Sequence, residues 1–229
     1  MKTILITGSA RGLGRELATR FARDKYNIII HDKDKEGLET LKEMVTFPGW
    51  ATCDVVEGDL KERETINDLY AISKLRDIDI LINNAGIRTS GSLKDMSAYN
   101  ISDMISVNLI APLQLTRVIY PIFLKKKSGM IININSIAGK NPNSDEAVYC
   151  ASKYGLRGFF DSFKFEAAEN NIAILSLYLG AMNTDMAMGR KDKNKLIDPS
   201  DVADFVYNIC VGDFKSFIIP EMDMWRKHR

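Results

Sequence analysis

The sequence predicts an α/β fold of the doubly wound kind, with a seven-stranded parallel sheet and helices on both of its faces. Two observations lead to this prediction. Short apolar runs alternate with longer amphipathic stretches, which is the pattern of parallel strands joined by helices. No linker rich in Pro, Gly or Ser divides the 229 residues, so residues 1–229 are expected to form a single domain.

Seven short runs rich in Ile, Leu and Val account for the strands. They are Thr3–Ile6, Asn27–His31, Thr52–Glu57, Ile78–Asn83, Met130–Asn135, Ala173–Leu179 and Ser216–Ile219. Helical periodicity appears between them, in Leu13–Arg23, Lys35–Met44, Glu62–Lys74, Tyr99–Leu124, Tyr149–Ala168 and Asp201–Val211. Each crossover is therefore a helix, as a right-handed β-α-β unit requires.

Composition narrows the class of protein. The formal net charge is +1 and 27% of the residues are charged, so neither nucleic acid nor a membrane is expected as a partner. The expected partner is a small-molecule substrate. The first residues run straight into a glycine-rich turn and are too short for a signal peptide, which favours a cytoplasmic protein. The cysteines, Cys53, Cys150 and Cys210, lack the spacing of a metal site.

The glycine-rich turn lies between the first strand and the first helix and reads Thr-Gly-Ser-Ala-Arg-Gly-Leu-Gly. Gly8 and Gly12 permit a tight bend and a close backbone approach, and Gly14 lets the helix pack near the strand. Helix amides then face a pyrophosphate, and Arg11 and Leu13 belong to the same predicted contact surface. The position of the turn predicts a Rossmann-like dinucleotide site.

Asp32 at the end of the second strand bears on the choice of cofactor. Its carboxylate is placed to accept hydrogen bonds from the adenosine ribose hydroxyls, which favours NAD(H). Lys33 and Arg11 could instead attract the ribose 2′-phosphate of NADP(H), so both cofactors stay possible, with NAD(H) modestly favoured. The alternative for Asp32 and Lys33 is a polar turn that starts the next helix.

Tyr149 and Lys153 are four residues apart in a predicted helix and therefore share a face. A neighbouring ammonium favours the phenolate and lowers a phenol pKa that starts at about 10. The pair therefore predicts that Tyr149 acts as an acid and base near neutral pH.

Several motifs resemble the signatures of the short-chain dehydrogenase/reductase family, and the resemblance extends over most of the chain. They are the turn Gly8-x-x-x-Gly12-x-Gly14, the sequence Asn83-Asn84-Ala85-Gly86, the set Ser136, Tyr149 and Lys153, and Asn108, which extends that set to a tetrad. The resemblance implies an NAD(P)-dependent oxidoreductase that transfers hydride between nicotinamide and an alcohol or carbonyl substrate. The alternative is a catalytically idle NAD(P)-binding sensor or scaffold protein.

The resemblance also implies roles for these residues. Tyr149 exchanges a proton with the substrate oxygen, and Ser136 hydrogen-bonds that oxygen. Lys153 lowers the pKa of Tyr149 and binds the nicotinamide ribose. The cofactor contacts implied after the fourth strand are Asn84, Ala85 and Gly86.

Pro112 lies four residues after Asn108 in a predicted helix and has no amide hydrogen to give to the Asn108 carbonyl. That carbonyl is therefore expected to be free. In the family, the backbone of this asparagine is associated with a water that links the lysine to solvent. The alternative is that Pro112 only bends a long helix.

Further cofactor contacts follow from the resemblance. Asp59, followed by Leu60, lies where the family's acidic residue meets the adenine, and Asp54 is the alternative. Gly180 and Thr184 follow the sixth strand and are implied near the nicotinamide. A leucine replaces the proline that the family usually has before Gly180, which leaves the rigidity of this turn in doubt.

Residues 185–197 occupy the position of the family's substrate lid and include a basic cluster. They could cover an acidic substrate or form a solvated loop, and Arg88 could meet an anionic substrate or face solvent. The helices Tyr99–Leu124 and Tyr149–Ala168 are apolar over more than one face, which favours a homodimer or homotetramer.

Overall fold

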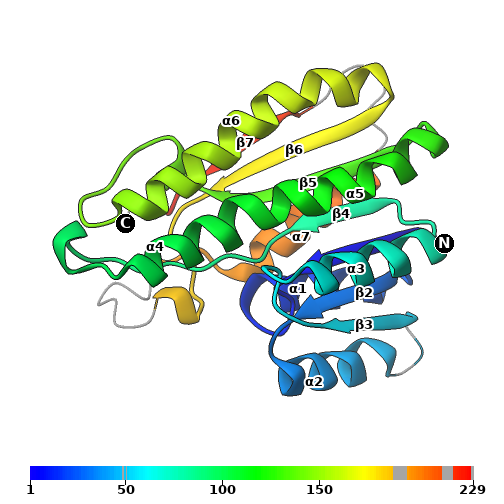
Figure 1. The fold of residues 1–229 in the computed structure, drawn as a ribbon. Coiled ribbons are helices and arrows are strands. Elements are labelled where there is room, and N and C mark those ends of the chain that lie inside the picture. Colours follow the sequence, from blue (N-terminus) through cyan, green and yellow to red (C-terminus); the bar gives the residue numbers. More distant parts are fainter. Residues whose placement is uncertain (48, 50, 188–194, 213–218, 228–229) are drawn as a thin grey trace.

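The computed structural model describes residues 1–47, 49, 51–187, 195–212 and 219–227, and the predicted α/β architecture is confirmed. Seven parallel strands form one sheet in the order β3-β2-β1-β4-β5-β6-β7 (Figure 1). The strands are β1 (Thr3–Thr7), β2 (Asn27–Asp32), β3 (Cys53–Glu57), β4 (Ile80–Asn83), β5 (Gly129–Ser136), β6 (Ile172–Leu179) and β7 (Glu221–Met224). The strand order reverses direction between β1 and β4, where sheets of this kind bind their ligands.

Helices cover both faces of the sheet (Figure 1). They are α1 (Gly12–Arg23), α2 (Lys35–Thr46), α3 (Arg63–Leu75), α4 (Ala98–Ile105), α5 (Ala111–Lys126), α6 (Ala147–Glu169) and α7 (Pro199–Val211). Leu17 of α1 and Val206 of α7 are buried on one face, and Leu69 of α3 and Phe160 of α6 on the other. Both faces of the central strands are therefore apolar, which explains why these strands read as continuous hydrophobic runs.

Three strands end at the same edge of the sheet and lead into the predicted site. β1 ends at Thr7 and enters the glycine turn, β4 ends at Asn83 and enters the Asn-Asn-Ala-Gly segment, and β5 ends at Ser136. The strands lie in parallel register, with Ile6 opposite Ile82 and Asn83 opposite Asn133. Parallel pairing thus brings together motifs that are far apart in the sequence.

The long helix predicted for Tyr99–Leu124 is interrupted. Helix α4 ends at Ile105, the five residues Ser106–Ile110 form a π-helical turn, and α5 continues from Ala111. The amide of Ala111 donates to the carbonyl of Ser106, which is the wider hydrogen-bond spacing of a π-turn. Pro112 follows at the start of α5 and contributes no amide to this ladder.

The seventh strand is displaced from its prediction. The predicted range Ser216–Ile219 lies, apart from Ile219, outside the described residues, and the strand that pairs with β6 is Glu221–Met224. Its sequence alternates acidic residues with methionine, and its exposure alternates in the same way. Such an edge strand lacks the continuous apolar run that identified the central strands.

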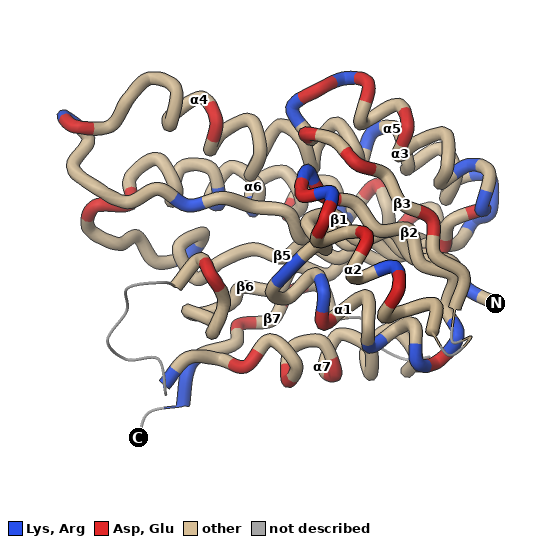
Figure 2. The backbone as a smooth tube through the Cα atoms, turned by 90° about the horizontal axis from the view of Figure 1, so that it is seen from below, with Lys and Arg blue, Asp and Glu red and all other residues tan. Residues whose placement is uncertain are grey.

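Acidic and basic residues alternate around the outside of the molecule, as expected from the small net charge (Figure 2). In the described part of the chain, one helical stretch, Ala98–Lys126, has the length and the mean hydropathy, 1.4, of a membrane-spanning helix. Leu115, Ile119 and Phe123 of this stretch are buried against the sheet. Its apolar composition is thus partly explained by the core.

Candidate active site

The glycine turn has the conformation that its glycines predict. Gly8 and Gly12 adopt positive φ angles of 66° and 55°. A Cβ atom at Gly14 would lie 2.1 Å from the carbonyl oxygen of Gly8, so no larger residue fits there. Helix α1 begins at Gly12 without a side-chain cap, which leaves its first amides available to an anionic group. These features fit the pyrophosphate of a dinucleotide.

Asn84 and Thr7 fasten the glycine turn to the end of β4. The Asn84 side-chain amide donates to the carbonyls of Thr7 and Gly8 at 2.8 and 2.9 Å. The Thr7 hydroxyl accepts from the amides of Asn84 and Ala85, both at 3.1 Å. A Cβ atom on Gly8 would lie 2.7 Å from the Ala85 Cα, so the two segments approach as closely as backbones can. Thr7 was not among the predicted site residues, although its position after β1 is a usable signal.

Asp32 organises the turn at the end of β2. Its carboxylate accepts the amide of Ala10 at 3.1 Å, that of Lys33 at 2.8 Å and that of Asp34 at 3.2 Å. The Lys33 side chain is exposed. Asp32 therefore links the glycine turn to the helix α2 that follows β2, as the polar-turn alternative expects. Its contact with the adenosine ribose stays a prediction.

Arg11 forms an exposed ion pair with Asp185 at 3.6 Å, and a Cβ atom on Gly12 would lie 3.2 Å from the Cγ2 of Thr184. The turn after β6 therefore lies against the glycine turn. Gly180 donates its amide to the carbonyl of Met224 at 2.9 Å.

The two ends of the predicted lid lie close together and are joined by backbone hydrogen bonds. Asn183 donates its amide to the carbonyl of Ile197, and Ile197 donates to the carbonyl of Ala181. Asp185–Ala187 form a 3₁₀ turn. Residues 188–194, with most of the basic cluster, lie outside the described residues.

The two carboxylates proposed for the adenine contact have different surroundings. Asp59 accepts the amide of Lys61 at 3.0 Å and pairs with its ammonium at 3.3 Å. The side chain of Leu60 is buried in the core, so a contact with adenine would fall to its backbone. Asp54, the alternative, accepts two hydrogen bonds from Arg76 at 2.7 and 2.8 Å.

Ser136, Tyr149 and Lys153 converge between β5 and α6. Tyr149 and Lys153 are 7% and 5% exposed, and the Lys153 ammonium lies 5.9 Å from the centre of the Tyr149 ring. Burial raises the pKa of Tyr149, and a hydrogen bond with Ser136 opposes the increase. The lowered pKa expected from the sequence is therefore wrong for this structure, because desolvation outweighs the neighbouring groups.

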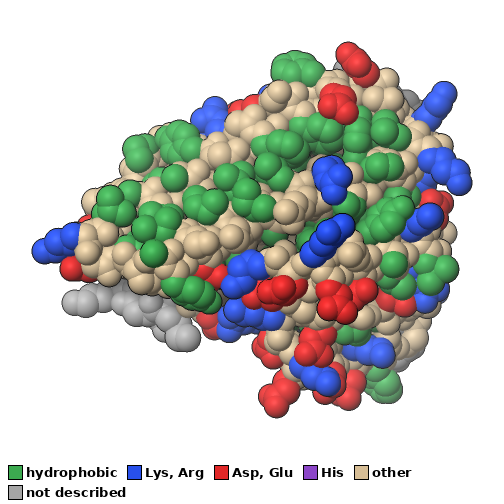
Figure 3. Space-filling model, in the orientation of Figure 1, with side chains coloured by type: hydrophobic (Ala, Val, Ile, Leu, Met, Phe, Trp, Pro, Cys, Tyr) green, Lys and Arg blue, Asp and Glu red, His purple; other side chains and the backbone are tan. Residues whose placement is uncertain are grey.

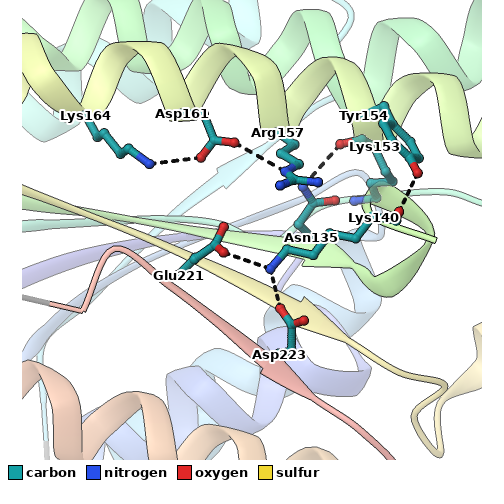
Figure 4. Close-up of polar contacts among 9 residues, drawn as sticks. All are labelled: Asn135, Lys140, Lys153, Tyr154, Arg157, Asp161, Lys164, Glu221 and Asp223. Atoms are coloured by element: carbon teal, nitrogen blue, oxygen red, sulfur yellow. Dashed lines mark hydrogen bonds and ion pairs between the residues drawn. The ribbon is translucent and has the colours of Figure 1, made fainter.

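The Lys153 ammonium is buried and donates to the carbonyl of Ile134 at 3.3 Å. Burial lowers its pKa to about 8. Asn135 supports both sides of this site. Its side-chain amide donates to the Lys153 carbonyl at 3.2 Å (Figure 4). Its Oδ1 accepts the amide of Ser136 at 2.8 Å. Asn135 was missed by the sequence analysis, where it read as an ordinary strand residue.

Asn108 lies in the π-turn and is buried. Its side chain accepts from the Ile87 amide and donates to the Ile87 carbonyl, both at 2.8 Å, and it donates to the Ser152 hydroxyl at 3.1 Å. A Cβ atom on Gly86 would lie 3.3 Å from the Asn108 Oδ1 and 3.6 Å from the Lys153 Nζ. The side chain of Asn108 thus positions the segment after β4, while the free state of its carbonyl stays a prediction.

A second polar cluster supports the turn that follows Ser136. Lys140 forms ion pairs with Glu221 at 3.0 Å and with Asp223 at 2.5 Å (Figure 4). Its ammonium also lies 4.0 Å from the centre of the Tyr178 ring. These contacts connect the β5 end of the site to β7. In the described part of the chain, no group of His, Cys, Asp and Glu is arranged to hold a metal ion.

The fold and the glycine turn define a dinucleotide-binding α/β protein, and comparisons with known proteins identify its family. The family model for short chain dehydrogenases matches residues 2–195. Carbonyl reductase family member 4 of Xenopus tropicalis is 30% identical over 214 residues, which are 90% of this chain and 89% of that protein. A 3-oxoacyl-[acyl-carrier-protein] reductase of Thermotoga maritima is 32% identical over 188 residues, 81% and 76% of the two chains.

Solved structures agree with this result. A metagenomic short-chain oxidoreductase in complex with NADP superposes with a TM-score of 0.83 at 28% identity, covering 97% of this chain and 96% of that one. An alcohol dehydrogenase from Thermococcus sibiricus, complexed with 5-hydroxy-NADP, has a TM-score of 0.89 at 21% identity, covering 99% and 96%, and shares the fold. The chain belongs to the short-chain dehydrogenase/reductase family and is an NAD(P)-dependent oxidoreductase acting on CH–OH or C=O groups.

Proposed function

We propose that this protein reduces a carbonyl substrate at a site built from Ser136, Tyr149 and Lys153, with Tyr149 as the proton donor. The observation that supports this most directly is the burial of the phenol and the ammonium together, with the ammonium against the end of β5 and the segment after β4. Such enclosure excludes water from the place where charge would move.

The residues divide the chemistry among them. When bound, the nicotinamide cofactor supplies or accepts the hydride. Ser136 hydrogen-bonds the substrate oxygen, and Tyr149 passes its proton to that oxygen as charge develops there. Burial raises the pKa of Tyr149, so the phenol keeps the proton that it would donate to a carbonyl oxygen. Lys153 contributes the positive charge, and Asn108 holds the backbone beside it.

Apolar side chains beside Tyr149 favour an apolar carbonyl compound. Met104 and Val148 are buried there, and the partly buried Ile87, Met96 and Ile101 pack against them. Two relatives are named for carbonyl and 3-oxoacyl reduction, which is consistent with such a substrate. Ethyl acetoacetate is therefore a suitable first compound.

For the cofactor, we propose a modest preference for NAD(H). The Asp32 carboxylate lies at the end of β2 beside the glycine turn and would repel a 2′-phosphate. Arg11, the cation of that turn, is paired with Asp185, although this exposed pair is weak. Similar solved structures contain NADP or NADPH, so the binding titration includes both NADH and NADPH.

The proposed function is tested by titrating the purified protein with NADH and NADPH and then adding ethyl acetoacetate, followed by other ketones and acetoacetyl-CoA. Loss of nicotinamide absorbance measures turnover. Tyr149→Phe should abolish turnover while cofactor affinity stays within about twofold, because the change deletes only the proton-bearing oxygen. Turnover retained by Tyr149→Phe would refute the assigned role, and cofactor binding without turnover by the wild type would favour the sensor alternative.

We also propose that the protein is a homodimer or homotetramer that pairs through α5 and α6. Apolar side chains are spread over the face formed by α4, α5 and α6 (Figure 3). Ile110, Tyr154 and Phe165 are exposed by 42%, 39% and 69%. Light scattering of the wild type and of Phe165→Lys tests this, and a monomer at all concentrations would contradict it.

A further inference from the structure

Glu146 is a buried carboxylate directly before α6, one helical turn from Tyr149. It is 7% exposed. Its Oε1 accepts a hydrogen bond from the Nε of Arg88 at 2.6 Å and pairs with the second guanidinium nitrogen, and its Oε2 accepts from the Asn143 amide at 2.9 Å. A carboxylate so deeply buried is tolerated when such donors compensate its charge.

Arg88 comes from the segment after β4, which Asn108 holds through both backbone groups of Ile87. A second connection lies nearby, where the Gly91 amide donates to the carbonyl of Asp145 at 2.8 Å. The segment that follows β4 is therefore fastened at two points to the segment that leads into α6. Through the Arg88–Glu146 pair, the start of the helix that carries Tyr149 is tied to the asparagine of the predicted tetrad.

This pairing argues against both alternatives for Arg88, which were contact with an anionic substrate and exposure to solvent. An arginine that faces solvent would make no such contact. The Arg88 side chain is only 28% exposed. An anionic substrate could reach Arg88 only in competition with Glu146, which would then be left buried beside Asn143 alone. Loss of one partner from a buried ion pair is strongly unfavourable. The contacts therefore favour a role inside the protein.

We propose that Arg88 and Glu146 form a positioning pair for Tyr149, which fixes the start of α6 against the segment after β4 and holds two opposite charges together at the helix start, one turn before Tyr149. The inference rests on the proposed function, because it gives Tyr149 the role of proton donor. Neither residue is assigned contact with the reacting atoms.

Glu146 and Arg88 have opposite effects on the pKa of the Tyr149 phenol. The Glu146 carboxylate raises the pKa of Tyr149 and the Arg88 guanidinium lowers it. The Cys150 thiol on α6 also raises this pKa, the Ser136 hydroxyl of β5 lowers it, and the Lys153 ammonium lies 5.9 Å from the ring centre. Removing one member of the pair therefore leaves the charge of the other acting on the phenol without compensation.

The test measures the titration of Tyr149 directly by carbon NMR of protein labelled at the tyrosine Cζ, with the Tyr149 signal assigned from Tyr149→Phe. The proteins compared are the wild type, Arg88→Gln, Glu146→Gln and the double variant, each titrated to pH 11. The midpoint should rise by roughly 0.5–1 pH unit in Arg88→Gln and fall by a similar amount in Glu146→Gln. In the double variant it should return close to the wild-type value.

A purely structural clamp gives a different result. Both single variants would then lose stability and move the midpoint in the same direction, or not at all, and either outcome overturns the proposal. Asp161→Asn is the matched control, because Asp161 pairs with Arg157 on the same helix at 3.3 Å and should leave the midpoint unchanged. The titration needs no turnover, so a failure of the positioning proposal can be distinguished from a failure of the role proposed for Tyr149 in catalysis.

Discussion

Replacement of Lys153 by methionine should change the pH dependence of stability in a direction that its burial fixes. The ammonium is enclosed by protein, with the carbonyl of Ile134 as its hydrogen-bond partner at 3.3 Å. Burial lowers its pKa from 10.5 to about 8. Methionine has a similar length and no charge, so Lys153→Met removes the titration while it keeps much of the packing.

The sign and size follow from the two pKa values. Below pH 8 the side chain is charged in both states, and the folded protein bears the full cost of burying the charge. Between pH 8 and pH 10.5 the unfolded chain binds more protons, so the free energy of unfolding rises with pH. At about 1.4 kcal/mol for each pH unit between the two values, the whole effect is about 3 kcal/mol, of which about 2.5 kcal/mol develops between pH 7 and pH 10.

Urea unfolding of both proteins at pH 7 and at pH 10, without cofactor, measures this effect. The stability of the wild type relative to Lys153→Met should increase by about 2.5 kcal/mol over that interval. Burial raises the pKa of the Cys53 and Cys210 thiols to about 12, which acts in the opposite direction, but both proteins contain these thiols and the comparison cancels them. Parallel stability profiles would refute the reasoning, because they would mean that Lys153 titrates as in the unfolded chain.

Three further predictions concern the supports of the site. Gly14→Ala should destabilise the protein by about 1–3 kcal/mol and weaken NADH binding, since its Cβ would lie 2.1 Å from the Gly8 carbonyl oxygen; unchanged urea and fluorescence titrations would show that the turn can widen. Lys140→Met should cost roughly 1–2 kcal/mol in urea unfolding, because two β7 carboxylates lose their cation, whereas a loss within about 0.5 kcal/mol would mean that they are adequately solvated. Asp32→Asn should lower the ratio of NADH to NADPH affinity in a binding titration, and an unaltered ratio would assign the preference to other groups.

The sequence was sufficient for those parts of the fold that depend on local pattern. Six strands lie where they were predicted, and five of them are runs rich in Ile, Leu and Val, because strands buried on both faces need apolar residues throughout; the edge strand β3 is apolar mainly at Val55 and Val56. The strand Glu221–Met224 was not predicted, since it depends on pairing with β6 rather than on its own composition. The π-turn at Ser106–Ile110 was also missed, because periodicity across a helix of this length does not resolve one extra residue.

The site divides in a similar way. Ser136, Tyr149 and Lys153 could be predicted because the helical spacing of the last two and the resemblance to a family both point to them. The pKa of Tyr149 could not, because it depends on how completely the folded chain removes water from the phenol. Arg88 and Glu146 are far apart in the sequence, and no local pattern indicates that their loops meet.

The π-turn also changes what the chain tolerates in length. In a regular helix, deletion of one residue rotates everything beyond it by about 100° and turns its buried face to solvent. Here a deletion within Ser106–Ile110 could close the wide turn into an ordinary helical one, so α4 and α5 would each keep the face that packs in the core. The position of Asn108 would be lost, and with it the support of Ile87. This turn is thus a place where the gene can lose a codon and the protein keep its architecture while the site comes apart.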